Sequence, residues 1–268
     1  MIRPYVALFR VRMVNGIQYR VAALAGIATQ FAWGFMLLLA FMAFYESNPH
    51  SFPMTMSQTV TFMWMQQAFL VLFMLWRYDN SIFESIEQGH IAYDLVRPMD
   101  LYSKWFTTNV AMRLSGMLLR CVPVLVVAFV LPPAFRITAP ASVVQFLAFA
   151  LSLALSLGVV VAFTMVIYVS AFYTINSQGT RTMAAIGGEF LAGAIIPIPF
   201  FPDHIRRIME LTPFGSMQNT PLLIFAGVTQ GRDIVVSIAL QVFWIVALVA
   251  VGRLIMGHAL RRVITQGG

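Results

Sequence analysis

Hydrophobic residues in this chain are gathered into long runs, and shorter segments between them carry most of the charges. A membrane-spanning helix needs about 20 predominantly apolar residues. The runs predict six transmembrane helices, at residues 21–44, 59–76, 114–131, 143–175, 182–197 and 234–252. The pattern therefore predicts an all-α polytopic membrane protein with a single transmembrane domain over residues 1–268.

The fourth run is the longest. Residues 137–180 contain no charged side chain, and a helix over residues 143–175 would be roughly 50 Å long at 1.5 Å per residue. Two spans would need about 40 residues and a turn, and no Pro-Gly or Asn-Gly break is present. The run therefore predicts one long helix that tilts or protrudes from the bilayer.

The N-terminal segment, residues 3–20, mixes arginines with apolar residues, and Pro4 suits a helix start. Most apolar positions share one face, which favours an interfacial helix whose arginines reach toward lipid phosphates. A basic flank without a defined helix is the simpler alternative. The first long apolar run starts only near Val21, without a convincing cleavage site, so no signal peptide is expected.

The segment over residues 197–231 lies between the fifth and sixth predicted spans. It contains several isolated prolines and two short apolar pieces, too short to span. This pattern predicts broken or re-entrant external helices, with Pro213-Phe214-Gly215 between them. An interfacial loop without re-entry remains the alternative.

Residues 79–100 form the largest charged island of the chain and hold five of the ten acidic residues. Asn80 or Ser81 is suited to cap a short helix that stops at Gly89, and Pro98 prevents helical continuation from Arg97. The pattern predicts a cytosolic helix across the inner mouth of the bundle, where a partner can push on it. A solvated connecting loop is the simpler alternative.

Composition and charge support the membrane class. The chain has 268 residues, of which 60% are hydrophobic and 10% charged, whereas soluble proteins carry roughly 25% charged residues. The net charge is +7, and in a membrane protein such an excess reports orientation and contact with anionic lipid, not nucleic acid. A single cysteine, Cys121, excludes an internal disulfide.

The distribution of basic residues predicts the orientation. One side of the six-span arrangement collects twelve: Arg3, Arg10, Arg12, Arg20, Arg77, Arg97, Lys104, Arg113, Arg181, Arg253, Arg261 and Arg262. The other side collects four: Arg136, Arg206, Arg207 and Arg232. The positive-inside rule then places both termini and the charged island in the cytosol.

No catalytic motif is found in the sequence. The one lysine, Lys104, follows Ser103, which excludes a GxxxxGK[ST] phosphate loop. The four histidines are scattered without metal-ligand spacing, so no metal is expected. Gly215-Ser216 invites comparison with an intramembrane serine protease, but no membrane-embedded histidine partner is available. We expect no enzyme and no cofactor bound by this chain.

Five polar residues lie inside predicted spans: Gln30, Gln66, Gln67, Arg120 and Glu189. A charge within a span usually faces a partner or a wet cavity. Arg120 and Glu189 have similar predicted depths, so we hypothesise that they pair or line one polar cavity. Snorkelling of Arg120 and protonation of Glu189 are the alternatives. The glutamines are candidates for a translocation path, or for ordinary interhelical hydrogen bonds.

The charged island resembles a signature of one bacterial branch of type-2 ABC exporter permeases, Gly-x-(Leu/Ile)-x-x-x-Leu-x-Arg-Pro. It matches at Gly89-His90-Ile91-Ala92-Tyr93-Asp94-Leu95-Val96-Arg97-Pro98. The external segment is similar too, at Ile196-Pro197, Phe201-Pro202, Leu211-Thr212-Pro213-Phe214 and Pro221 to Gly227. Thr212 stands where that branch often has a leucine before Pro-Phe. The six spans and the interfacial and cytosolic helices also fit this family.

The resemblance implies an export permease of the bacterial cytoplasmic membrane, working with separate ABC ATPase subunits that bind ATP and Mg²⁺. A second permease, identical or paralogous, would complete the path through the bilayer. The ATPase-coupling residues implied are Ser81, Ile82, Glu84, Ser85, Glu87, Gln88 and Arg97. Substrate contacts would come from spans one, two and five, and the cargo is not indicated.

Two other classes remain open from the sequence. One is a secondary transporter or channel without an ATPase, although the two halves show no evident internal repeat. The other is a non-transporting membrane scaffold. A neighbouring gene with a phosphate loop would favour the ABC assignment.

Overall fold

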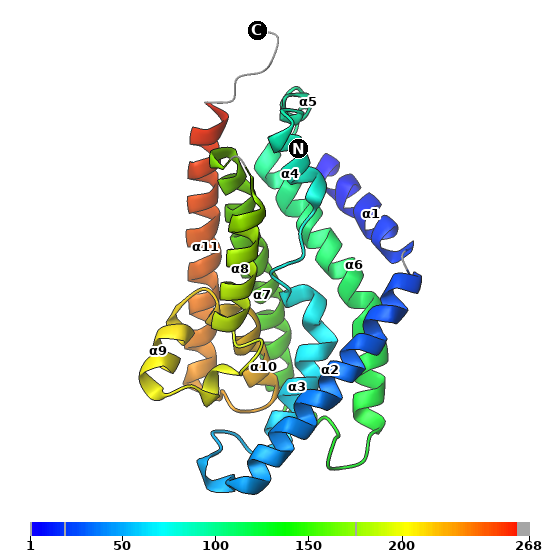
Figure 1. Ribbon diagram of the computed structural model, residues 1–268, viewed down its shortest axis with the longest axis vertical. Coiled ribbons are helices and arrows are strands. Elements are labelled where there is room, and N and C mark those ends of the chain that lie inside the picture. Colours follow the sequence, from blue (N-terminus) through cyan, green and yellow to red (C-terminus); the bar gives the residue numbers. More distant parts are fainter. Residues whose placement is uncertain (1, 19, 175, 262–268) are drawn as a thin grey trace.

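The computed structural model describes residues 2–18, 20–174 and 176–261, and every regular element in these ranges is a helix. Long helices run beside one another along the longest axis of the molecule (Figure 1). The short helices α4 (Asn80–Glu87) and α5 (Ile91–Leu95) lie at one end, with the last turns of α11. Ile175, the side chain of Arg20 and Arg262, used in the predictions above, lie outside the described residues.

Four helices are long and apolar enough to cross a membrane: α2 (Arg20–Ser47), α6 (Leu101–Val130), α7 (Val143–Ser170) and α11 (Arg232–Leu260). Each overlaps a predicted span, although α6 begins well before residue 114, α7 ends before residue 175 and α11 continues beyond residue 252. α7 is unbroken and continues into a short 3-10 turn at Ala171–Tyr173, so the long fourth run forms one helix. Its N-terminus is capped by Ser142, whose hydroxyl accepts from the Gln145 backbone N–H.

Two of the six predicted spans, residues 59–76 and 182–197, do not form helices that are long and apolar enough to count as membrane-spanning. In α3 (Met56–Phe73), every residue from Thr59 to Phe73 except Leu70 is buried, which lets the helix carry Gln66 and Gln67 away from lipid. α8 (Gln178–Leu191) has 14 residues, about 21 Å at 1.5 Å per residue. The fifth predicted span is thus wrong at both ends, and the six-span arrangement stays a prediction.

The early end of α8 has a local cause. Gly193 adopts φ +77°, a left-handed conformation that favours glycine after a helix. A Cβ at this position would lie 3.0 Å from the Ile198 backbone nitrogen, so the turn is also too tight for a side chain. The helix therefore ends at Leu191, before Pro197, the residue at which the predicted span ends.

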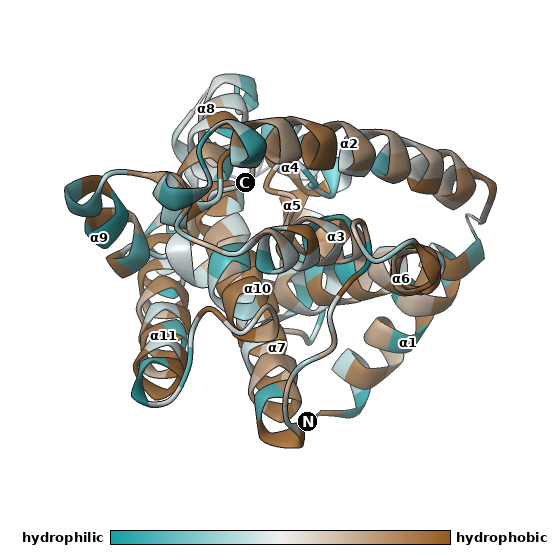
Figure 2. Ribbon diagram, turned by 90° about the horizontal axis from the view of Figure 1, so that it is seen from below, coloured by the Kyte–Doolittle hydropathy of each residue, from teal (hydrophilic) through white to brown (hydrophobic). Residues whose placement is uncertain are grey.

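The segment before the last span is broken, as predicted. It comprises a 3-10 turn at Ile198–Phe200, α9 (Asp203–Leu211), a π-helix at Gly215–Asn219 and α10 (Thr220–Phe225). α9 carries hydrophilic residues at the rim of the molecule (Figure 2). The five residues Pro221 to Phe225 of α10 are all buried. The segment therefore enters the protein interior at α10, between α3 and α7.

The core lies where α3, α6, α7 and α10 meet, with Trp64 and Tyr168 among its largest fully buried side chains. The Trp64 indole nitrogen donates to the Phe135 carbonyl at 2.8 Å, which ties α3 to the loop after α6. Helix α1 (Arg3–Gln18) packs along α6 and has no buried residue. It is separate from α2, in keeping with the predicted N-terminal interfacial helix (Figure 1).

Candidate functional site

Helix α4 and its contacts form the candidate functional site. Asp79 caps the helix, because its Oδ1 accepts from the Ser81 backbone N–H at 3.1 Å and from the Ser81 hydroxyl at 2.6 Å. The prediction that Asn80 or Ser81 caps the helix was therefore wrong by one or two positions. The predicted stop is correct, since Gly89 follows the C-cap Gln88 with φ +74°.

The side chains of α4 divide into a buried and an exposed set. Ile82 and Phe83 are buried, at 5% and 1% exposure, and Phe83 packs on the ring of Tyr168. Ser85 is half-buried and donates to the Ile82 carbonyl at 3.0 Å. The exposed set consists of polar residues: Asn80, Ser81, Glu84, Glu87 and Gln88. The helix thus offers one polar surface to its surroundings and fixes the other on the bundle.

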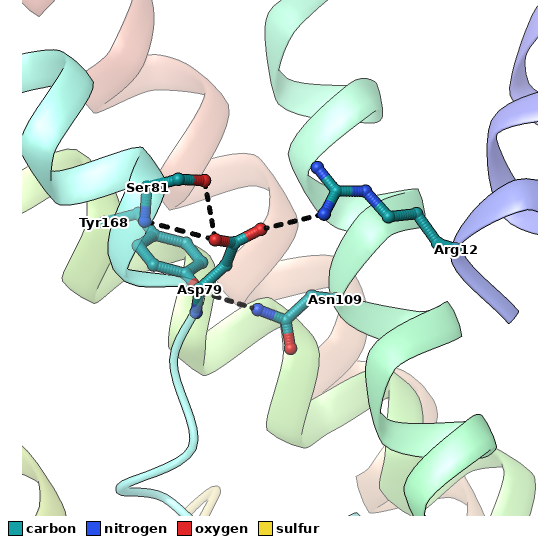
Figure 3. A network of polar contacts seen from close by, with 5 residues as sticks. All are labelled: Arg12, Asp79, Ser81, Asn109 and Tyr168. Atoms are coloured by element: carbon teal, nitrogen blue, oxygen red, sulfur yellow. Dashed lines mark hydrogen bonds and ion pairs between the residues drawn. The ribbon is translucent and has the colours of Figure 1, made fainter. Parts of the chain in front are cut away.

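A polar network connects the start of α4 to three other helices (Figure 3). The Asp79 carboxylate lies 3.7 Å from Arg12 of α1. The Asp79 backbone N–H donates to the Tyr168 hydroxyl of α7 at 2.7 Å. The same hydroxyl accepts from the Asn109 amide of α6 at 3.0 Å. A displacement of Asp79 is therefore felt directly by α1 and α7, and by α6 through Tyr168.

Arg113 of α6 continues this network deeper into the bundle and is fully buried, at 0% exposure. Its Nε donates to Asn109 Oδ1 at 2.9 Å. Its remaining donors reach oxygens on α7 and at the end of α3: Leu72 O at 3.1 Å, Met74 O at 2.6 Å, Arg77 O at 3.2 Å and Thr164 Oγ1 at 3.2 Å. All five guanidinium N–H groups are thus used.

The position of Arg113 has a simple electrostatic reason. The last carbonyls of a helix lack intrahelical donors and carry partial negative charge, so a cation is favourable there. Arg113 supplies both the charge and the donors at the end of α3. Arg113 is thus buried within the bundle and not at its surface, and the side of the membrane predicted for it from the charge count stays a prediction.

The far end of α4 is fixed to the start of α8. The Glu87 carboxylate accepts from the backbone N–H and hydroxyl of Ser177, at 3.1 and 2.8 Å. These two hydrogen bonds lower the pKa of Glu87 below its ordinary value. Arg181 of α8 lies over the Phe83 ring, 4.5 Å from its centroid, and donates to Asn80 Oδ1 at 3.1 Å. α4 therefore holds α8 at both of its own ends.

Arg97, the last of the predicted coupling residues, lies beyond α5. It is 4.0 Å from Asp94, which also pairs with Lys104 of α6 at 2.6 Å. Asp100 caps α6 by accepting from the Ser103 backbone N–H. The structure thus ties the charged island to α6 through carboxylates and places Arg97 at its exposed margin.

The two charges predicted inside spans are not joined in the structure. Arg120 lies against Gly26 of α2. A Cβ at Gly26 would overlap the Arg120 guanidinium, so the glycine leaves room for it. The Glu189 carboxylate of α8 accepts from the backbone N–H of Leu75, which lies in the linker after α3, at 3.3 Å. No ion pair between them is present among the described residues. Each charge contacts a different neighbouring segment, and the alternative that both line one polar cavity stays a prediction.

The three predicted glutamines are buried, at 2% exposure for Gln30, 3% for Gln66 and 4% for Gln67. Gln66 donates to the Ala194 carbonyl at 2.7 Å, which ties α3 to the turn after α8. Both side-chain polar atoms of Gln30, and Oε1 of Gln67, have no hydrogen-bond partner in the described part of the chain. Gly34, one turn after Gln30, faces Trp64 and Gln67. These amides lie at or near the contact of α2 with α3.

Several residues of the site were missed from sequence: Arg12, Asp79, Asn109, Arg113, Tyr168, Ser177 and Arg181. Part of the signal was present, because Asn109 and Arg113, like Thr164 and Tyr168, are polar pairs four residues apart in apolar helices. Such spacing places both members on one helix face. What the sequence did not reveal is that the two faces meet.

Near α4, Asp79 and Glu87 are held by hydrogen bonds or ion pairs, whereas the Glu84 side chain has no such partner within the described residues. Within the described residues, no three His, Cys, Asp or Glu side chains lie close enough to hold a metal ion. The cysteine, Cys121, is free and buried. The polar groups of the site act on one another and on backbone carbonyls.

Comparison with protein families matches residues 27–267 to the family described as ABC-2 family transporter protein. The match covers nearly the whole chain. No curated protein and no solved structure matches the chain in the corresponding searches.

Proposed function

The chain belongs to the ABC-2 transporter family, and on that premise we propose that it is the permease subunit of an ATP-driven exporter in the bacterial cytoplasmic membrane. A separate ABC ATPase binds ATP and Mg²⁺ and docks on α4. A second permease, identical or paralogous, completes the path through the bilayer. In this proposal six segments span, and both termini and α4 lie in the cytosol.

The observation that carries the proposal is the double character of α4. Its exposed residues, Glu84 and Gln88 among them, are free to meet a partner protein. Its buried residue Phe83 and the cap residue Asp79 contact α1 and α7 directly, and α6 through Tyr168. A helix that is accessible on one face and fixed to the bundle on the other is suited to pass the movement of a docked ATPase on to the bundle.

We infer two routes for that push. The first runs from Asp79 through Tyr168 and Asn109 to Arg113, which holds the end of α3. The second runs from Glu87 and Phe83 to Ser177 and Arg181, at the start of α8. The first route consists of hydrogen bonds among half-buried or buried groups, and the second combines the hydrogen bonds of the exposed Glu87 with the contact of Arg181 on the Phe83 ring.

The second route leads to a cavity of 440 Å³ beside α8, lined by Trp76, Tyr78, Arg181 and Glu189 among others. We propose that this surface faces the second permease and contributes to the translocation path. Arg120, Gln30, Gln66 and Gln67 are placed by this proposal on the neighbouring α2 and α3 side of the path. The transported substrate is not specified by these contacts.

Glu84→Arg tests the docking role of α4. Glu84 is exposed and makes no hydrogen bond or ion pair among the described residues, so its reversal should leave the fold intact. We expect transport and permease-stimulated ATPase activity of the complex to fall severalfold, because the reversed charge opposes the docked partner. Activity is measured after reconstitution of the permease with its ATPase in vesicles.

Glu46→Arg is the matched control, since Glu46 is equally exposed but lies at the end of α2 remote from α4 (Figure 1). It should leave both activities unchanged. Wild-type activity in Glu84→Arg, or transport by the permease without any ATPase, would refute the proposal.

A further inference from the structure

A second polar site lies at the other end of the bundle from α4. It is a cavity of 440 Å³ between α9, the π-helix and the first turns of α11. Its walls combine apolar residues, such as Leu223 and Leu240, with the charged residues Arg207, Glu210 and Asp233. None of these residues takes part in the network around α4. The cavity therefore needs an explanation of its own.

Asn219, the last residue of the π-helix, lines this cavity and is 3% exposed. Its amide oxygen has no hydrogen-bond partner among the described residues. A buried polar atom without a partner loses its hydrogen bonds to water and gains none in return, which is unfavourable. A ligand that donates a hydrogen bond from within the cavity would remove this cost.

The backbone that carries Asn219 is held from two sides. The Ser216 carbonyl accepts from the Gln241 amide of α11 at 2.9 Å, and the Met217 carbonyl accepts from the Ser156 hydroxyl of α7. π-Helices are rare in proteins, and those that do occur are frequently found at functional sites. Here side chains from two long helices stabilise it, so the orientation of Asn219 is built into the fold.

The charges of the cavity suit a ligand with a cation and an anion. Glu210 and Asp233 supply two carboxylates; Glu210 lies 3.9 Å from Arg206, and Asp233 forms no ion pair within the described residues. Partial burial raises the pKa of Glu210, while Arg206 and Arg207 oppose the shift. Arg207 likewise has no carboxylate partner in the described ranges and is free to meet an anion.

Exposed apolar residues surround the cavity. α9 exposes Ile205, Ile208 and Leu211, at 49%, 66% and 65%. α11 exposes Val236 beside the cavity and Val242 further along. Polar residues above a continuous apolar helix surface are the pattern expected at the boundary between lipid headgroups and acyl chains. The apolar wall of the cavity continues into this surface at Val236.

We propose that this cavity binds the headgroup of a zwitterionic phospholipid with a primary amine, in the leaflet opposite α4. The ammonium lies between Glu210, Asp233 and the Asn219 amide oxygen. The phosphate meets Arg207, and an acyl chain follows the exposed apolar face of α11. The proposal goes beyond transport and does not depend on the ATPase.

Native mass spectrometry of the purified full-length protein tests this. The protein is equilibrated in detergent micelles that hold phosphatidylethanolamine and phosphatidylglycerol in equal amounts. The wild type should retain phosphatidylethanolamine in preference. Asn219→Leu and Asp233→Asn should each bind it about tenfold more weakly, the effect of one lost charge-assisted hydrogen bond.

Asp203→Asn is the matched control, because Asp203 lies on α9 but points its carboxylate to Arg206, outside the cavity. It should retain the lipid as the wild type does. Soluble glycerophosphoethanolamine, which lacks acyl chains, should not displace the lipid at equal concentration. Equal retention of both lipids by the wild type, unchanged retention in both cavity variants, or full displacement by the soluble headgroup would each overturn the proposal.

Discussion

Two buried asparagines, Asn109 in α6 and Asn219 at the end of the π-helix, differ in their hydrogen-bond partners. Asn109 is 0% exposed, accepts from Arg113 and donates to Tyr168. Asn219 is 3% exposed, and its amide oxygen accepts nothing among the described residues. The first belongs to the network through which we propose that α4 moves the bundle, and the second lines the cavity that we propose binds a lipid headgroup.

The comparison extends to the segments around them. Near Asn109, hydrogen bonds are made between regular helices and satisfy every donor of Arg113. Near Asn219, two further buried polar atoms, Ser216 Oγ and Gln218 Nε2, also lack partners in the described part of the chain. The two asparagines are thus alike in burial and differ in the pairing of the side-chain oxygen, and each unpaired buried group calls for an explanation.

The largest effect is expected from Arg113→Met. The substitution leaves five buried oxygens without their donor, at Asn109, Leu72, Met74, Arg77 and Thr164. We expect the free energy of unfolding to fall by at least about 3 kcal/mol. Thermal unfolding of the purified protein measures this. Arg120→Met, on the same helix but half-buried, should cost clearly less; equal losses would argue against the special role of Arg113.

A pair of identical substitutions tests the comparison directly. Asn109→Leu removes both hydrogen bonds of a satisfied amide and should lower the stability by about 2–3 kcal/mol. Asn219→Leu replaces an amide whose oxygen is unpaired, so its effect should be within about 1 kcal/mol of zero, of either sign. Both are measured by thermal unfolding in lipid-free detergent. Similar losses in the two variants would remove the distinction between the sites.

The smallest effect concerns the contact of Glu87 with Ser177. Because the pKa of Glu87 is lowered in the folded protein, the contact is present above its ordinary value of 4.5 and is lost as the pH falls through the lowered value. Hydrogen exchange at the Ser177 amide should be slower in the wild type than in Glu87→Gln. This difference should be constant between about pH 5 and 8 and vanish at lower pH.

A difference that already disappears above pH 5 would contradict the lowered pKa of Glu87. Glu84→Gln is the matched control, because Glu84 is on the same helix and contacts no other helix through a hydrogen bond among the described residues. In Glu84→Gln, hydrogen exchange at the Ser177 amide should be as slow as in the wild type at every pH.

Local chemistry made much of the fold predictable. The apolar runs located four long helices, Gly89 marked the end of α4, and the prolines of residues 197–231 indicated a broken segment. The errors arose where a neighbour decided the outcome. α8 ends early because Gly193 packs tightly on Ile198, and α3 tolerates glutamines because other helices surround it.

The sequence by itself determined that this is a helical membrane protein with one charged island, since apolar run length and residue type act locally along the chain. Only the tertiary structure decided which polar residues meet. Arg113 reads as one arginine among many until α3, α6 and α7 place five oxygens around it. In the same way, the position of Asn219 at the cavity depends on a π-helix that is held by side chains of α7 and α11. Hydrogen bonds are short and directional, so their partners are set by packing in three dimensions and not by spacing along the chain.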